Sequence, residues 1–281
     1  MNWRLVMAET LKLRKSRGLV IATILMTLGI GVLVILIPEL YRVAHPSASF
    51  AGGQRGLQRI GIAVGFIGSI AAMLVGTAAG TGDLSTGIFR DMVATGKSRA
   101  ALFGSRVPGA LVYWLPLITF SYLVAALLDL AFSSHSAIGP PARSLGSPAG
   151  AVSFFNGTVP PMHQFVDWYL WILLYTGFVL LVSIGLSSWI GSRAITLGVL
   201  IPFQLFVAPI LSNISQLGAV REILYPQSIG YLAPRAGPGA GAGHSFGVLV
   251  TSSLGIAWLV LVVWVILAIG AGLWRTLTRD A

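Results

Sequence analysis

The chain has 281 residues, of which 56% are hydrophobic and 9% are charged, and its formal net charge is +10 at pH 7. A soluble domain carries about 25% charged residues, so this composition excludes a soluble globular protein and indicates an integral membrane protein. The chain contains no cysteine, which excludes disulfides, thiolate catalysis and cysteine-bound metal ions.

Residues 1–17, MNWRLVMAETLKLRKSR, predict an amphipathic helix lying in the membrane interface. On a helical wheel the apolar side gathers Trp3, Val6, Met7, Thr10, Leu11 and Leu13, with Arg14 intruding. Glu9, Lys12 and Lys15 lie on the opposite side, where the bases face lipid headgroups, and Trp3 acts as an interfacial anchor. The alternative is an unstructured basic tail that only fixes orientation.

Six apolar runs follow, each near the roughly 20 residues that a membrane span needs. They predict an all-α membrane protein with a single transmembrane domain over residues 1–281 and spans at about 19–38, 60–81, 108–132, 168–190, 194–213 and 248–273. The first run exceeds the roughly 7 to 15 residues of a signal-peptide core, and no convincing cleavage site follows it. We therefore expect an uncleaved first span.

The basic residues are distributed unevenly between the two sides of this topology. With both termini in the cytoplasm, the inner segments hold 12 of the 18 Lys and Arg residues, mostly in short loops near the ends of spans. This asymmetry follows the positive-inside rule and predicts a multi-pass protein with both termini cytoplasmic. The positive charge then sets orientation and meets anionic lipid, so we expect no nucleic-acid partner.

The second span carries small residues at four-residue spacing, namely Gly61, Gly65, Ser69, Gly76 and Gly80. Such a stripe lets another backbone approach closely and predicts tight helix packing, within the chain or in a dimer. Four prolines, Pro108, Pro116, Pro202 and Pro209, predict bends in the third and fifth spans. Before the last span, residues 221–234 combine apolar anchors and are a candidate for a segment that dips into the membrane surface.

Reactive groups that converge on a catalytic site are not evident in the sequence. The four histidines have no partner at metal-ligand spacing, and no phosphate-binding loop or serine-hydrolase motif is present. Asp129 lies near the outer end of the third span, Asp167 just before the fourth and Glu39 just after the first. All three fall at predicted interfaces, which argues against a carrier with a buried carboxylate relay. We expect no catalytic residue, no bound cofactor and no metal site in this chain.

Residues 81–106, TGDLSTGIFRDMVATGKSRAALFGSR, form a polar interruption between the second and third spans. Asp83 is a predicted N-cap and Gly96 a predicted left-handed C-cap for a short amphipathic helix between them. Its apolar side includes Ile88, Phe89 and Met92, and Ser98 is placed to cap the third span. Periodicity alone leaves two readings open: a helix resting on the lipid boundary, or a docking element for a partner protein.

This segment and the N-terminal ETLKLRKSR together resemble the type-2 ABC transporter permeases, which are the membrane subunits of bacterial exporters. The resemblance covers about 45 residues in motif and the whole chain in topology. Asp83 stands where many members have Glu, and Ser105 beside Arg106 stands where Lys is frequent.

The resemblance implies a transport subunit rather than an enzyme, in the cytoplasmic membrane of a bacterium. It further implies a dimer of permeases, two separate ABC-type ATPase chains that bind ATP and Mg, an interfacial N-terminal helix and a re-entrant segment before the last span. By motif, the residues that couple to the ATPase are Asp83, Thr86, Ile88, Phe89, Arg90, Met92, Lys97, Ser98 and Arg99. The implied substrate is an amphiphilic, drug-like or peptide compound. The alternatives are a secondary carrier or channel that needs no ATPase, and a membrane scaffold that transports nothing.

Overall fold

The computed structural model describes residues 3–44, 54–85, 94, 96, 98–136, 162–234 and 253–278. This part of the chain is almost entirely helical and contains no strand. It holds six helical segments that are long and apolar enough to cross a membrane: Arg17–Tyr41, Gly56–Asp83, Arg99–Phe132, Met162–Ile190, Arg193–Asn213 and Leu254–Thr278. The prediction of an all-helical chain with six such segments is confirmed.

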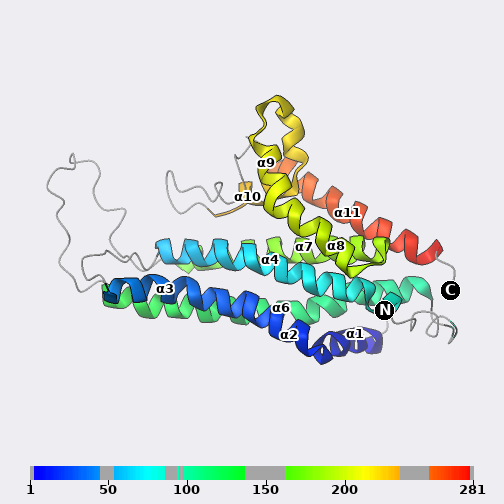
Figure 1. Ribbon diagram of the computed structural model, residues 1–281, viewed down its shortest axis with the longest axis horizontal. Helices are drawn as coiled ribbons and strands as arrows, with labels where there is room; N and C mark the ends of the chain where they lie inside the picture. The colour runs from blue at the N-terminus through cyan, green and yellow to red at the C-terminus, as the bar shows by residue number, and fades with distance from the viewer. Residues whose placement is uncertain are drawn as a thin grey trace.

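The first span follows a separate N-terminal helix. Helix α1 comprises Trp3–Lys15. Ser16 follows it with a ψ of 87°, which breaks the helical path before α2 (Arg17–Ile24) begins. Helix α2 continues through a π-helical turn, η1 (Leu25–Gly29), into α3 (Ile30–Ala44), and together these elements form the first apolar rod. In Figure 1, α1 and the last turns of α11 lie at the same end of the bundle, as an even number of crossings requires.

The centre of the bundle is formed by α4 (Gln54–Ser85), α6 (Arg99–Ser136) and α7 (Met162–Ile190). Helices α4 and α7 lie side by side along most of their lengths (Figure 1). Trp168 and Trp171 of α7 lie against Gly61 and Gly65 of α4. The Trp114 indole of α6 also contacts α7, where it donates to Thr176 Oγ1 over 3.1 Å. The α4 and α7 spans are accordingly the most buried of the six.

The fifth span is built from α8 (Arg193–Pro202), the π-helical turn η2 (Phe203–Val207) and α9 (Ala208–Asn213). Ser192 caps α8, because its Oγ accepts from the Ile195 amide over 3.4 Å. The last span is α11 (Leu254–Thr278), which packs along α7.

Between these spans, the 3-10 helix η3 (Ser215–Ile223) and α10 (Tyr225–Tyr231) fold back against the bundle. Six consecutive residues of α10, 225–230, are buried. The indole of Trp171 donates to Ile229 O over 2.9 Å, and that of Trp264 donates to Ile223 O over 2.9 Å. Each tryptophan stands about ten residues inside its helix, roughly 15 Å from the end at 1.5 Å per residue, so residues 223–229 lie well below the helix ends.

Two predicted helix boundaries differ from the structure. The third span was predicted to begin at Pro108, but α6 begins at Arg99, because Ser98 caps it: Ser98 Oγ accepts from the Ala101 amide over 3.3 Å. Arg99 and Arg106, which precede Pro108, therefore belong to the helix. The second span also continues past residue 81, to Ser85. The predicted start of the last span, residue 248, falls within 235–252, outside the described residues.

Candidate functional site

Four charged side chains meet at the end of the bundle where α1, α4 and α6 come together: Glu9, Lys12, Asp83 and Arg106. We call this group the ionic cluster. The Lys12 ammonium donates to both oxygens of Glu9 over 3.0 Å and to Asp83 Oδ1. On its other side, Asp83 Oδ2 lies 3.7 Å from Arg106 Nη2. The cluster thus joins three helices that are far apart in the sequence.

Arg106 is the most deeply placed member, with no exposed surface. Its Nη1 donates to the Gly80 carbonyl over 3.0 Å and to Ser188 Oγ over 3.2 Å, and Ser188 in turn donates to the same carbonyl over 3.2 Å. A buried guanidinium is stable only when it is paired and hydrogen-bonded. Arg106 therefore links the end of α4 to α7 as well as to the cluster.

The contact between α1 and α6 depends on Gly109. A Cβ at Gly109 would lie 2.6 Å from Glu9 Cβ and 3.2 Å from the Val6 carbonyl oxygen, so a larger residue would separate the helices. Thr10 Oγ1 uses this close approach to donate to the Gly109 carbonyl over 3.1 Å. Val6 and Leu13 are buried on the same side of α1. One side of α1 is thereby fixed against the bundle, which brings Glu9 and Lys12 to Asp83.

The charges of the ionic cluster sum to zero, two acids against two bases. Burial raises the pKa of Glu9 above its ordinary value of 4.5, and the nearby Asp83 charge raises it further, while Lys12 and Arg106 act in the opposite direction. The native protein therefore binds a proton at Glu9 more tightly than the unfolded chain does.

This shift predicts how stability depends on pH. The contribution of Glu9 to the free energy of unfolding is full below pH 4.5 and is lost as the pH rises through the raised pKa. Substituting Glu9→Gln removes the titration, so the variant should lose less stability than the wild type as the pH rises from about 4.5 to neutrality. Thermal unfolding in detergent at a series of pH values measures this, and identical pH slopes for the two proteins would contradict it.

The structure places only part of the predicted ATPase-coupling set. Asp83 is in the ionic cluster, Ser98 caps α6, and the Arg99 guanidinium donates to the Leu277 carbonyl of α11 over 2.9 Å. Gly96 has a φ of 84°, the left-handed conformation predicted for it. Thr86, Ile88, Phe89, Arg90, Met92 and Lys97 lie outside the described residues.

Two details of the sequence interpretation are wrong. Asp83 is not the N-cap of a separate helix, because α4 continues through it to Ser85 and its carboxylate is engaged by Lys12 and Arg106. Glu9 does not lie on a lipid-facing polar side of α1, since only 7% of its surface is exposed. The helical wheel placed Trp3 on the same side as Val6. In the structure Val6 is buried, whereas Trp3 is 58% exposed and Arg14 is also exposed.

The small-residue stripe of α4 faces α7 of the same chain. A Cβ at Gly61 would lie 2.1 Å from the Trp168 ring, and one at Gly65 would lie 2.6 Å from the Trp171 ring. At Gly76 and Gly80 the corresponding contacts are with serine hydroxyls of α7, at 2.1 Å and 2.0 Å. Ser69 accepts from Gln204 Nε2 over 2.7 Å. The stripe is covered within the monomer and is not a free face for a second copy.

A small polar network occupies the middle of the bundle. Gln204 lies on the π-helical turn η2, donates to Ser69 Oγ and accepts from the Tyr225 hydroxyl over 3.3 Å. Both Gln204 and Tyr225 are buried. A π-helical turn widens a helix locally and is frequent at functional sites. The network contains no charged group and holds α10 to the fifth span.

Arg106 and Gly109 are the members of this site that the sequence interpretation did not single out. Arg106 entered only as one of the cytoplasmic basic residues and as the neighbour of Ser105 in the family motif. Two features could have identified Arg106: its position seven residues after the start of α6, and the small residue Gly109 one turn later at the contact with α1. The two become recognisable as a pair only when α1 and α6 are placed side by side.

Comparisons of the chain with models of protein families, with curated proteins and with solved structures found no match.

Proposed function

We propose that this chain is the membrane-spanning permease subunit of an ATP-driven exporter, which works as a dimer with separate ABC-type ATPase subunits. The observation that carries the proposal is the position of the ionic cluster. Asp83 and Arg106 flank, on α4 and α6, the segment that the sequence resemblance identifies as the coupling helix. A displacement of that segment would be transmitted into the bundle through these two side chains.

Further contacts connect this pair to other helices. Lys12 links Asp83 to α1, which the same resemblance assigns to the inner membrane surface. Arg106 contacts Gly80 and Ser188 and so links the pair to α7, and Arg99 connects the start of α6 to the end of α11. Buried charge pairs have strict geometry, so they transmit a shift of one helix to its partners rather than absorbing it. The substrate that we propose is an amphiphilic, drug-like or peptide compound, expelled from the bacterial cytoplasmic membrane.

Association with an ATPase tests the proposal directly. The tagged chain, solubilised in mild detergent from its native host, should co-purify with an ABC-type ATPase, and Phe89→Asp or Arg90→Glu should abolish this association while membrane insertion is unchanged. Trp3→Ala, at an exposed position on the far side of α1, is the control and should leave co-purification intact. A chain that purifies without any ATPase would instead support a secondary carrier or channel.

A further inference from the structure

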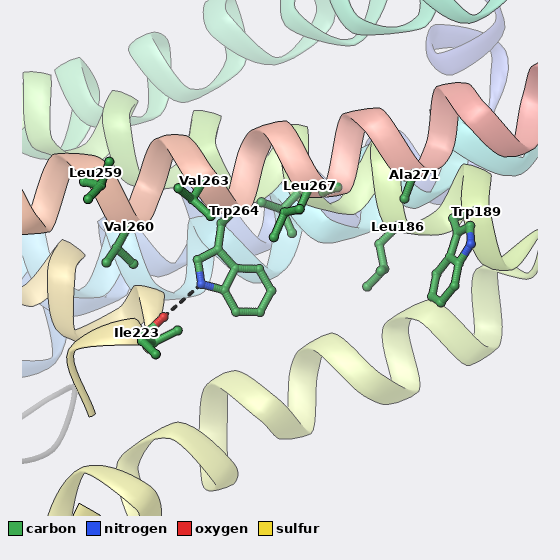
Figure 2. Close-up of a pocket in the computed structure, with 11 residues that line it drawn as sticks. Leu186, Trp189, Ile223, Leu259, Val260, Val263, Trp264, Leu267 and Ala271 are labelled. Carbon is green, nitrogen blue, oxygen red and sulfur yellow. Dashed lines mark hydrogen bonds between the residues drawn. The ribbon is translucent and has the colours of Figure 1, made fainter. Parts of the chain in front are cut away.

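An apolar groove runs along α11, with α7 as its second wall. Val182, Leu186 and Trp189 of α7 face Val263, Leu267 and Ala271 of α11 across it, and its volume is about 460 Å³. Figure 2 shows Trp264 and Leu267 projecting from α11, and Ile223 closing one end through its hydrogen bond to the Trp264 indole. Because both walls belong to membrane-spanning segments, the groove opens to lipid.

The length of the groove matches that of one acyl chain. From Leu259 to Ala271 its α11 wall spans twelve residues, about 18 Å at 1.5 Å per residue. One leaflet of a bilayer core is about 15 Å thick, half of about 30 Å. An acyl chain needs only a narrow channel of leaflet length.

Basic side chains stand at the open end of the groove. Arg193 follows Trp189 by four residues at the start of α8, and Arg275 lies one helical turn beyond Ala271 on α11. Both are exposed, and within the described parts of the chain neither guanidinium makes a hydrogen bond or ion pair. Trp189, 47% exposed, marks the same level, where tryptophans favour the membrane interface.

We propose that this groove binds one anionic phospholipid, with an acyl chain along α11 and the phosphate between Arg193 and Arg275. Each basic residue near an anionic headgroup favours binding, so a phosphatidylglycerol should be preferred to a phosphatidylcholine with the same chains by about tenfold or more. The acyl chain would lie in the groove over the line where α7 and α11 meet. This inference does not depend on the transport proposal.

Native mass spectrometry of the purified full chain, incubated with equal amounts of dioleoyl phosphatidylglycerol and dioleoyl phosphatidylcholine, tests the proposal. The wild type should retain one phosphatidylglycerol per chain. Ala271→Phe fills the groove and should abolish retention of both lipids. The control is Gly270→Phe, one residue away, where an added Cβ meets nothing within 4 Å, and it should bind as the wild type does.

The headgroup contact is tested by the double variant Arg193→Gln/Arg275→Gln, which should bind both lipids equally. Unchanged retention in Ala271→Phe would overturn the proposal, as would an unchanged headgroup preference in the double variant. A wild type that carries no lipid but forms a dimer broken by Ala271→Phe would assign the groove to a second copy and would also overturn it.

Discussion

Replacing Arg106 with glutamine should destabilise the protein by about 3 kcal/mol, because it leaves Asp83 and Glu9 facing only one base, Lys12, in a buried site. The same substitution removes the donor to Gly80 and Ser188, so α4 and α7 lose a link at this end. We also expect loss of transport in the proposed exporter. Equilibrium unfolding in mixed micelles measures the change in stability.

Charge balance gives this prediction a sharp control. Asp83→Asn alone leaves one base in excess, whereas Asp83→Asn combined with Arg106→Gln returns the net charge of the cluster to zero. The double variant should therefore be more stable than either single variant. Arg14→Gln, at an exposed position on α1, should change stability by less than about 0.5 kcal/mol. A double variant that loses the sum of the two single effects would show that Asp83 and Arg106 act independently.

The second large effect is expected at Gly185, where α7 and α11 meet. A Cβ there would lie 2.3 Å from the backbone carbon and oxygen of Ala268, and Gly272 touches Gly185 from the other helix at 2.6 Å by the same measure. Since the obstacle is backbone, α11 must move for a methyl group to fit. We expect Gly185→Ala to destabilise the protein by about 1 to 3 kcal/mol.

The matched control lies on the same helix. At Gly177, two turns earlier, an added Cβ meets nothing within 4 Å. Gly177→Ala should be neutral or should stabilise α7 by up to about 1 kcal/mol through its greater helix propensity. Thermal unfolding of the two variants, measured side by side in one detergent, compares one added methyl group in two settings. Equal unfolding midpoints would contradict the proposed contact between α7 and α11.

The six spans are predictable from the sequence because lipid selects for length and apolarity, and both are properties of a local stretch. The same reasoning fails at Arg106. A search for apolar runs ends each span at a charge, because a charge in hydrocarbon is unfavourable. Arg106 escapes that rule through partners 26 and 82 residues away in the sequence, which a local pattern does not reveal.

The helical wheel of α1 illustrates a second limit. Periodicity identified the helix and its amphipathic character, but it predicted that only the apolar side faces the interior. In the structure Glu9 and Thr10 are buried because Asp83 and Gly109 lie opposite them. Likewise, the glycines of α4 indicated a close contact without identifying α7 as the partner. The pairing of faces is a tertiary property that one sequence read locally does not encode.

The ionic cluster also has a consequence for the order in which the protein is assembled. Glu9 and Lys12 are synthesised first and Asp83 much later, and Ser188 follows Arg106 by 82 residues. At roughly 5 to 20 residues per second, Arg106 leaves the ribosome about 4 to 16 s before its last ligand exists. During that interval α7 has not been made, and the α4 glycines that it covers face lipid or the insertion machinery. The nascent third helix must therefore hold its guanidinium near the water interface until the fourth span arrives, which makes the late insertion of α7 the step that completes the site.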